Sequence, residues 1–190
     1  MEPKSVTKYF KKMVGERIYL SPINTDDIET YTKWINDPEV AINLGAYPLQ
    51  FSLLNEKTAL EELAAGQNYA IVRVEDDVLL GNIGLVDLNQ LHQKVEVGLF
   101  IGDECNRSQG YGAEALRLML TYCFQTLNMH NVCLHVHGDN ARGISCYEKV
   151  GFKKCGHRRE ALYKNGNFVD LIQMDLLAQE YDTKENKENR

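Results

Sequence analysis

The chain has 190 residues, 44% of them hydrophobic and 25% charged, which is the size and composition of one globular domain. No run approaches the roughly 18 apolar residues that a membrane span needs, and the N-terminus lacks a signal segment, so a cytoplasmic protein without a membrane partner is expected. The net charge of -6 disfavours a nucleic-acid surface and weakly favours a cationic substrate. Five cysteines without C-x-x-C spacing indicate reduced thiols.

The first half of the chain alternates between strand and helix patterns. Residues 16–23 alternate as a strand, and Asn24 offers cap chemistry for a helix that Pro38 stops. Residues 39–52 have weak periodicity and are expected to form a loop that could line a substrate cleft. A second helix is predicted over 55–65. Three consecutive strands are then expected to form an antiparallel meander: 69–74, 78–88 and 95–101.

The second half begins with a helix. From Gly110 to Leu127 apolar residues repeat at helical spacing, which predicts a core-facing helix of about four turns. The order of elements favours an α/β (α+β) fold with a mixed, mostly antiparallel central sheet and helices on both faces. We expect a solvated N-terminal arm over 1–15 and not a transit peptide, one domain over 16–177 and a charged tail over 178–190. The remaining elements are a strand at 131–137, a helix at 140–149, a strand from 152, a hairpin turn at 164–167 and a strand at 168–176.

An anion site is predicted where the third strand of the meander meets that helix. The segment from Arg107 to Gly112 places backbone N–H groups and glycines at a helix N-terminus, where a pyrophosphate is favoured, and Arg107 can add a direct charge. The segment lacks the Gly-Lys-Ser/Thr of a P-loop and the three spaced glycines of a dinucleotide fingerprint. Taken alone, this short motif is better interpreted as a plain glycine-rich turn.

Two further patterns accompany this segment. Gly98 lies in mid-strand, which is typical of a bulge or of close approach by a ligand or another backbone. Downstream, Asn140 precedes a helix, Tyr147 lies one turn before its end, and Gly151-Phe152 follows.

Together these patterns resemble the GNAT superfamily of N-acetyltransferases. The R-x-x-G-x-G segment at 107–112 is similar to that family's pyrophosphate loop, and N-x-x-x-x-x-x-Y followed by G-F is similar to the helix beneath its coenzyme. Segments 16–20, 34–38 and 170–177 resemble the branch that contains ribosomal-protein N-terminal acetyltransferases and related small-amine, polyamine-type acetyltransferases. The resemblance covers 16–177.

The resemblance implies acetyl-CoA as co-substrate and a primary amine as acceptor: a protein N-terminus, a polyamine or another small amine. It implies direct attack in a ternary complex and a monomer or homodimer. Backbone N–H groups near Leu99 to Ile101 are implied to bind the acetyl carbonyl, and Asn140 to bond the pantetheine arm or anchor the strands, with a helix N-cap as the alternative. The implied coenzyme-binding residues are Leu99, Phe100, Ile101, Arg107, Ser108, Gln109, Gly110, Tyr111, Gly112, Ala113, Asn140 and Tyr147.

Two residues are implied to be catalytic. Glu96 shares a strand face with Gly98 and Phe100, on the side of the expected bulge, and by the resemblance accepts the amine's proton through water; an exposed carboxylate or an ion-pair partner is the alternative. Tyr147 resembles the family's general acid near the coenzyme sulfur, with a packing tyrosine as the alternative.

Other chemistries are disfavoured. Cys133, His135 and His137 share a strand face, but no fourth ligand is visible, so no metal is expected. Cys146 lacks a histidine partner for nucleophilic catalysis. The alternative function is a catalytically inactive acyl-CoA-binding sensor or interaction domain, and an unrelated nucleotide-binding protein is disfavoured by the absent P-loop lysine.

Overall fold

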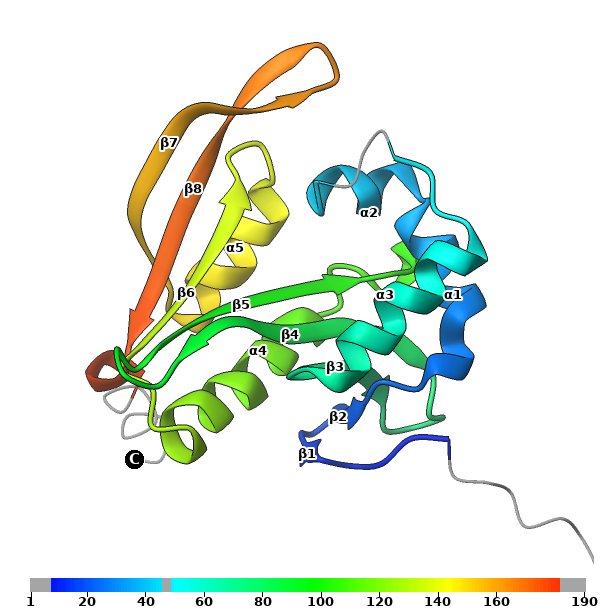
Figure 1. Cartoon of the computed structure of the whole chain (residues 1–190). Coiled ribbons are helices and arrows are strands. Elements are labelled where there is room, and N and C mark those ends of the chain that lie inside the picture. The colour runs from blue at the N-terminus through cyan, green and yellow to red at the C-terminus, as the bar shows by residue number, and fades with distance from the viewer. Residues whose placement is uncertain (1–7, 46–48, 182–190) are drawn as a thin grey trace, which may run out of the picture.

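The computed structural model describes residues 8–45 and 49–181, and a single twisted sheet runs through it (Figure 1). The strand order is β1-β2-β3-β4-β5-β6-β8-β7, and only the β5–β6 pair among them is parallel. This confirms the mixed, mostly antiparallel sheet. The strands are β1 (Met13–Val14), β2 (Ile18–Pro22), β3 (Asn68–Arg73), β4 (Leu79–Asn89), β5 (Lys94–Ile101), β6 (Asn131–His137), β7 (Lys153–Lys164) and β8 (Asn167–Leu177).

Helices cover both faces of the sheet, as expected (Figure 1). Two clusters of buried hydrophobic residues lie between the helices and the sheet. One includes Leu116 and Met119 of α4, and the other includes Trp34 of α1 and Leu60 of α3. None of the helices in the described ranges is long and apolar enough to cross a membrane. The helices are α1 (Ile28–Ile35), α2 (Pro38–Asn43) and α3 (Leu53–Ala65) on one side, and α4 (Tyr111–Thr121) and α5 (Ala141–Val150) on the other.

The expectation of a loop over residues 39–52 is wrong at its start, where α2 forms. The side chain of Asp37 accepts a hydrogen bond from the Glu39 N–H, and Pro38 occupies the first helical position. Proline fixes a helical φ there and has no N–H to leave unsatisfied. Pro38 therefore ends α1 and also begins α2, a helix of only six residues that periodicity cannot reveal.

Both ends of the described chain pack against the sheet. Tyr9 is buried and donates its hydroxyl to Asp27, so the solvated character expected for the arm is wrong for this residue. The Lys12 N–H pairs with the Leu20 carbonyl, while the Lys12 side chain is exposed as expected. At the other end Tyr181 is buried and its ring lies 5.0 Å from that of Phe124. The rest of the arm (1–7) and of the tail (182–190) lies outside the described residues.

Candidate active site

A gap opens in the middle of the sheet where β5 and β6 part. The two strands pair only from Lys94–Asn131 to Glu96–Cys133. Beyond that point β5 stays with β4 and β6 stays with β8. Each strand therefore has an edge at the gap whose backbone N–H and C=O groups are not used by the other. A ligand with amide groups can pair with such an edge.

Gly98 lies at this gap. The register of β4 and β5 is continuous around it, so the bulge expected there is wrong; the register shift of β5 lies near Asn89, at the other end of the strand. A Cβ atom built on Gly98 would meet nothing within 4 Å. The alternative expectation, close approach by a ligand, is the one compatible with this open space.

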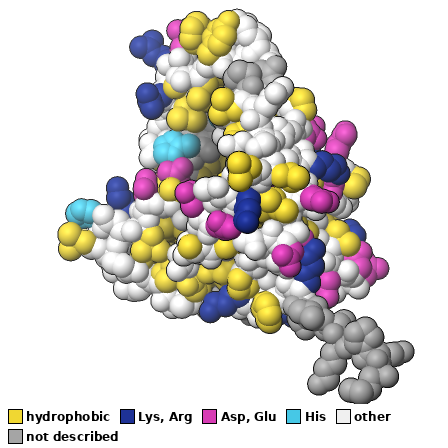
Figure 2. Space-filling model, turned by 45° about the vertical axis from the view of Figure 1, so that its right-hand side comes forward, with side chains coloured by type: hydrophobic (Ala, Val, Ile, Leu, Met, Phe, Trp, Pro, Cys, Tyr) yellow, Lys and Arg dark blue, Asp and Glu magenta, His cyan; other side chains and the backbone are white. Residues whose placement is uncertain are grey.

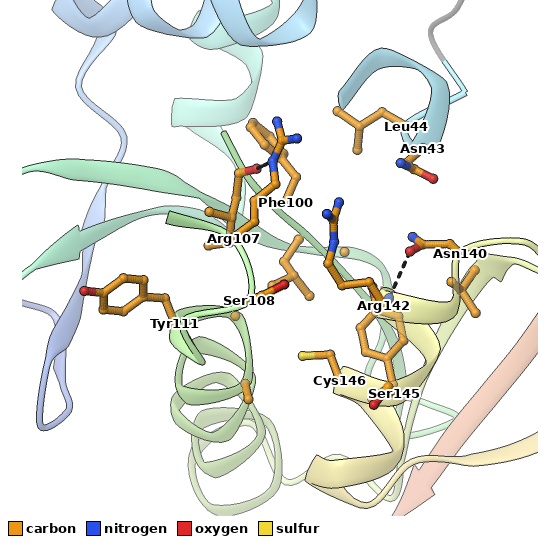
Figure 3. A pocket seen from close by; sticks show the side chains of 18 of the residues that line it. Asn43, Leu44, Phe100, Arg107, Ser108, Tyr111, Asn140, Arg142, Ser145 and Cys146 are labelled. Atoms are coloured by element: carbon orange, nitrogen blue, oxygen red, sulfur yellow. Dashed lines mark hydrogen bonds between the residues drawn. The ribbon is translucent and has the colours of Figure 1, made fainter. Parts of the chain in front are cut away.

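A cleft of about 480 Å³ surrounds the gap. It receives side chains from α2, β5, the loop before α4, β6 and α5, and Figure 3 shows several of them. All of the site residues expected from the sequence line it except Gln109. They are Glu96, Leu99, Phe100, Ile101, Arg107, Ser108, Gly110, Tyr111, Gly112, Ala113, Asn140 and Tyr147.

The loop before α4 has the geometry of an anion cradle. Ser108 and Gly110 adopt positive φ angles of 60° and 88°, and Gly110 is the N-cap of α4. The helical hydrogen bonds begin with Glu114 N–H to the Gly110 carbonyl, and no side chain caps this end. Backbone N–H groups of the first turn thus lie at the cleft without a helical acceptor, which is what binds phosphate at helix N-termini.

Arg17 of the β1–β2 turn contacts and stabilises the loop before α4. Its Nη1 donates to the Gln109 carbonyl at 3.0 Å, and its Nε lies 3.0 Å from Oε2 of Glu114. Its guanidinium also lies 5.1 Å from the centre of the Tyr111 ring, and in Figure 3 this ring points away from the other labelled side chains. Tyr111 therefore offers the cleft its backbone rather than its phenol. The sequence carries no signal for Arg17, which is 92 residues from Gln109.

The contacts of the Arg107 side chain differ from the direct contact with a phosphate that the sequence predicted. It is buried, and its Nε and Nη2 donate to the carbonyls of Ile101 and Gly102 (Figure 3). Nη1 lies 2.6 Å from Oε2 of Glu39 on α2. The guanidinium is directed to the end of β5 and to α2, so the direct charge expected for a phosphate is already compensated inside the protein.

Glu39 is held between two arginines across the cleft. Arg142 in the first turn of α5 donates to its Oε1 at 2.8 Å, while Arg107 lies against its other oxygen. The hydrogen bond from Arg142, together with the Arg107 charge, lowers the pKa of Glu39 and outweighs the raising effect of burial. Sequence reasoning missed both Glu39 and Arg142, because the two are 103 residues apart.

Asn140 caps α5, as its alternative interpretation predicted. Its Oδ1 accepts the Gly143 N–H at 2.9 Å, the dashed line beside Arg142 in Figure 3. Since the carbonyl is occupied, the side-chain NH₂ is the group that this residue can offer to a ligand.

Tyr147 and Cys146 occupy the α5 side of the cleft. Tyr147 is half-buried, its ring lies 6.1 Å from that of Phe152 in an edge-on arrangement, and burial raises its pKa to about 12. The phenol is therefore protonated at neutral pH. Burial also raises the pKa of the Cys146 thiol, which disfavours the thiolate that a nucleophile needs.

Glu96 lies on the opposite face of the gap and is paired. Its Oε1 is 3.0 Å from Nδ1 of His135, which agrees with the alternative role of Glu96 as an ion-pair partner.

Within the described residues, no group of three or more His, Cys, Asp or Glu side chains is arranged to hold a metal ion. On the face seen in Figure 2, acidic and basic side chains are interspersed with hydrophobic ones and do not form one large basic patch.

Comparison with known proteins identifies the family. The model of the acetyltransferase (GNAT) domain matches residues 17–153. The chain belongs to this acetyltransferase family. The expected family is thus confirmed, and the enzymes of this family use acetyl-CoA as co-substrate.

The similar proteins come from the expected branch. The chain is 31% identical over 103 residues to a spermidine N(1)-acetyltransferase of Vibrio cholerae, which is 54% of this chain and 59% of that one. It is 33% identical to YdaF of Bacillus subtilis, a protein provisionally named as a ribosomal N-acetyltransferase. This alignment covers 56% of this chain and 58% of that one. In structure, it superposes on a spermidine N-acetyltransferase of Vibrio cholerae solved with CoA and spermine, with a TM-score of 0.79, 22% identity and coverage of 88% and 99%. The chain thus aligns in sequence with somewhat more than half the length of those two relatives.

Proposed function

We propose that this protein transfers the acetyl group of acetyl-CoA to a primary amine by direct attack in a ternary complex. The observation that carries the proposal is the parting of β5 and β6 beyond Glu96 and Cys133, within a cleft that also contains the uncapped N-terminus of α4. An extended thioester can lie with its diphosphate on the helix and its acetyl group in the gap. The amine then has access from the opposite face.

The two faces of the gap carry different chemistry. We propose that Tyr147, on the α5 side, donates its O–H toward the departing thiolate, because a phenol with a pKa of about 12 keeps its proton at neutral pH. Glu96, on the other side, takes part in removing the proton from the attacking amine. Backbone N–H groups near Leu99 to Ile101 stabilise the oxyanion on the acetyl carbon.

For the coenzyme, we propose a division between backbone and side chains. The N–H groups of residues 108–113 bind the diphosphate, with Arg107 and Gln109 shaping the loop through their own contacts. Asn140 donates from its NH₂ to an amide of the pantetheine arm. Domain limits at 16 and 177, a cytoplasmic location and a monomer or homodimer stay part of this proposal, as expected from the sequence.

The acceptor is proposed to be a polyamine, a protein N-terminus or another small amine. Spermidine and ribosomal-protein acetyltransferases among the relatives support this range. The carboxylate of Glu96 in the cleft is compatible with a cationic acceptor, whereas that of Glu39 is already paired with Arg107 and Arg142.

The test is thiol release from acetyl-CoA across a panel of spermidine, spermine, N-terminal peptides, amino sugars and amino acids. Release with at least one amine, together with a mass gain of one acetyl group on it, is the expected result. Binding of acetyl-CoA by calorimetry without release on any amine would instead indicate an inactive acyl-CoA sensor. Absence of binding would overturn the proposal altogether.

A further inference from the structure

The pair formed by Glu96 and His135 has the geometry of an oriented acid-base dyad. Glu96 lies on β5 at the last residue that pairs with β6, and its partner in that register is Cys133. His135 follows Cys133 by two residues and therefore lies on the same face of the sheet, one step into the gap. The two side chains meet there at 3.0 Å between Nδ1 and Oε1.

Both side chains are accessible from the cleft. His135 is 37% exposed and Glu96 30%, and both line the cleft together with Gly98. The carboxylate occupies Nδ1, which leaves Nε2 as the ring nitrogen free to take a proton in the neutral tautomer with hydrogen on Nδ1.

A second histidine on the same face does not share this arrangement. His137 also lines the cleft, but its Nδ1 is buried and has no hydrogen-bond partner in the described structure. Burial and the nearby Lys164 lower its pKa, which opposes protonation. The nearby Asp139 raises this pKa, but its effect is smaller than that of burial, and within the described residues no carboxylate is hydrogen-bonded to the buried Nδ1 of His137 as Glu96 is to that of His135.

Other charged groups lie near β6, and within the described residues Glu96 is the side chain that pairs with His135. On the strand β8, Gln173 is the residue opposite His135. The titratable groups on the surrounding elements include Glu39 on α2, Lys94 on β5, Cys133 and His137 on β6, Asp139 after β6, Cys155 and Lys164 on β7, and Asp175 on β8.

We propose that His135 is the direct proton acceptor for the amine and that Glu96 is its positioning residue. This inference rests on the proposed acetyl transfer and names the group that activates the acceptor. It assigns to Glu96 a different task from proton transfer through water: the carboxylate fixes the tautomer of His135 and stabilises the imidazolium that forms.

The nitrogen lone pair of the amine forms a bond to the acetyl carbon, and a proton on that nitrogen passes to Nε2 of His135. The C–S bond then breaks, and its electron pair leaves on the CoA sulfur, which receives a proton from Tyr147 or water. Imidazole suits the first transfer because its ordinary pKa lies nearer neutral pH than that of any other side chain. Solvent then takes the proton from the imidazolium and, where Tyr147 has donated its own, returns one to the phenolate, which restores the enzyme.

The experiment compares His135→Gln, Glu96→Gln and the double variant with the intact protein on the best amine of the panel. The matched control is His157→Gln, an exposed histidine on β7 that does not line the cleft. We expect kcat of His135→Gln to fall about 100-fold at pH 7 while the Kd for acetyl-CoA stays within about twofold. The double variant should be no slower than His135→Gln, because the two residues act as one unit.

A pH series separates this role from a structural one. The defect of His135→Gln should shrink toward about tenfold as pH rises to 9.5, since solution then supplies more neutral amine. A defect that is constant with pH, activity of His135→Gln within threefold of the intact protein, or effects that multiply in the double variant would each overturn the dyad. If the intact protein itself acetylates no amine, the proposed function fails first, and the calorimetric binding data show at which step.

Discussion

Nη1 of Arg107 lies 2.6 Å from Oε2 of Glu39, and this contact joins the end of β5 to α2 across the cleft. The same carboxylate receives Arg142 from α5. One glutamate therefore fixes three elements that meet only in the folded protein. Its partner Arg107 is buried, so removal of the negative charge leaves this buried cation with the more distant carboxylate of Asp37, at 3.8 Å, as its ion-pair partner.

Glu39→Gln should lower the free energy of unfolding by about 1–2 kcal/mol, between the values typical of exposed and of buried pairs because Glu39 itself is partly exposed. Denaturant unfolding at pH 7 measures it, with the exposed Glu61→Gln on α3 as control. Since the pKa of Glu39 is lowered in the folded state, its contribution is present above its ordinary pKa and is lost as pH falls through the lowered value. The difference between Glu39→Gln and the intact protein should therefore shrink in acid. An equal difference at pH 7 and pH 3 would contradict this account.

Gly110→Ala should weaken acetyl-CoA binding at least tenfold. Its φ of 88° is strained for alanine, and the new Cβ would lie 3.0 Å from Nη2 of Arg17, the side chain that braces the loop. Gly166→Ala is the matched control, because Gly166 has a φ of 82° with nothing near its Cβ position and lies outside the cleft. Both variants should lose similar stability, and only the first should lose affinity in calorimetry. Equal affinity in the two would remove the cradle from the binding site.

Gly98 offers a graded test of the gap. Substitution by Ala or Val meets no atom within 4 Å of the Cβ position, so thermal unfolding should change little. The added carbons project into the cleft from the face of β5 that carries Glu96, and acetylation should fall from Gly to Ala to Val. The rate and the Tm are measured on the same samples; a full rate in a folded Gly98→Val would mean that the substrates do not meet at this gap.

Tyr147→Phe should lower kcat about 10- to 100-fold and leave the Kd for acetyl-CoA within about twofold, because the ring keeps its contact with Phe152 while the proton donor is lost. Since burial raises the pKa of Tyr147 to about 12, deprotonation of this phenol should not reduce kcat below about pH 11. Steady-state kinetics from pH 7 to 10 check both statements. Unchanged kcat in Tyr147→Phe would return Tyr147 to a packing role alone.

Local patterns in the sequence determined much of this protein. The meander, the glycines 110 and 112 at the start of α4, and the cap of α5 by Asn140 each depend on residues close together in the chain, where strand period, φ preference and capping chemistry act directly. The family resemblance rests on these same local segments, and its match to residues 17–153 confirms it.

Only the tertiary structure decided which side chains face one another. Arg107 contacts Glu39 in place of the expected phosphate, because the position of α2 brings together two residues that are 68 apart in the chain. Glu96 contacts His135, 39 residues away, because the two lie on neighbouring strands where β5 and β6 part. The energy of such contacts depends on distance and burial in space, and neither quantity is written in the local order of residues.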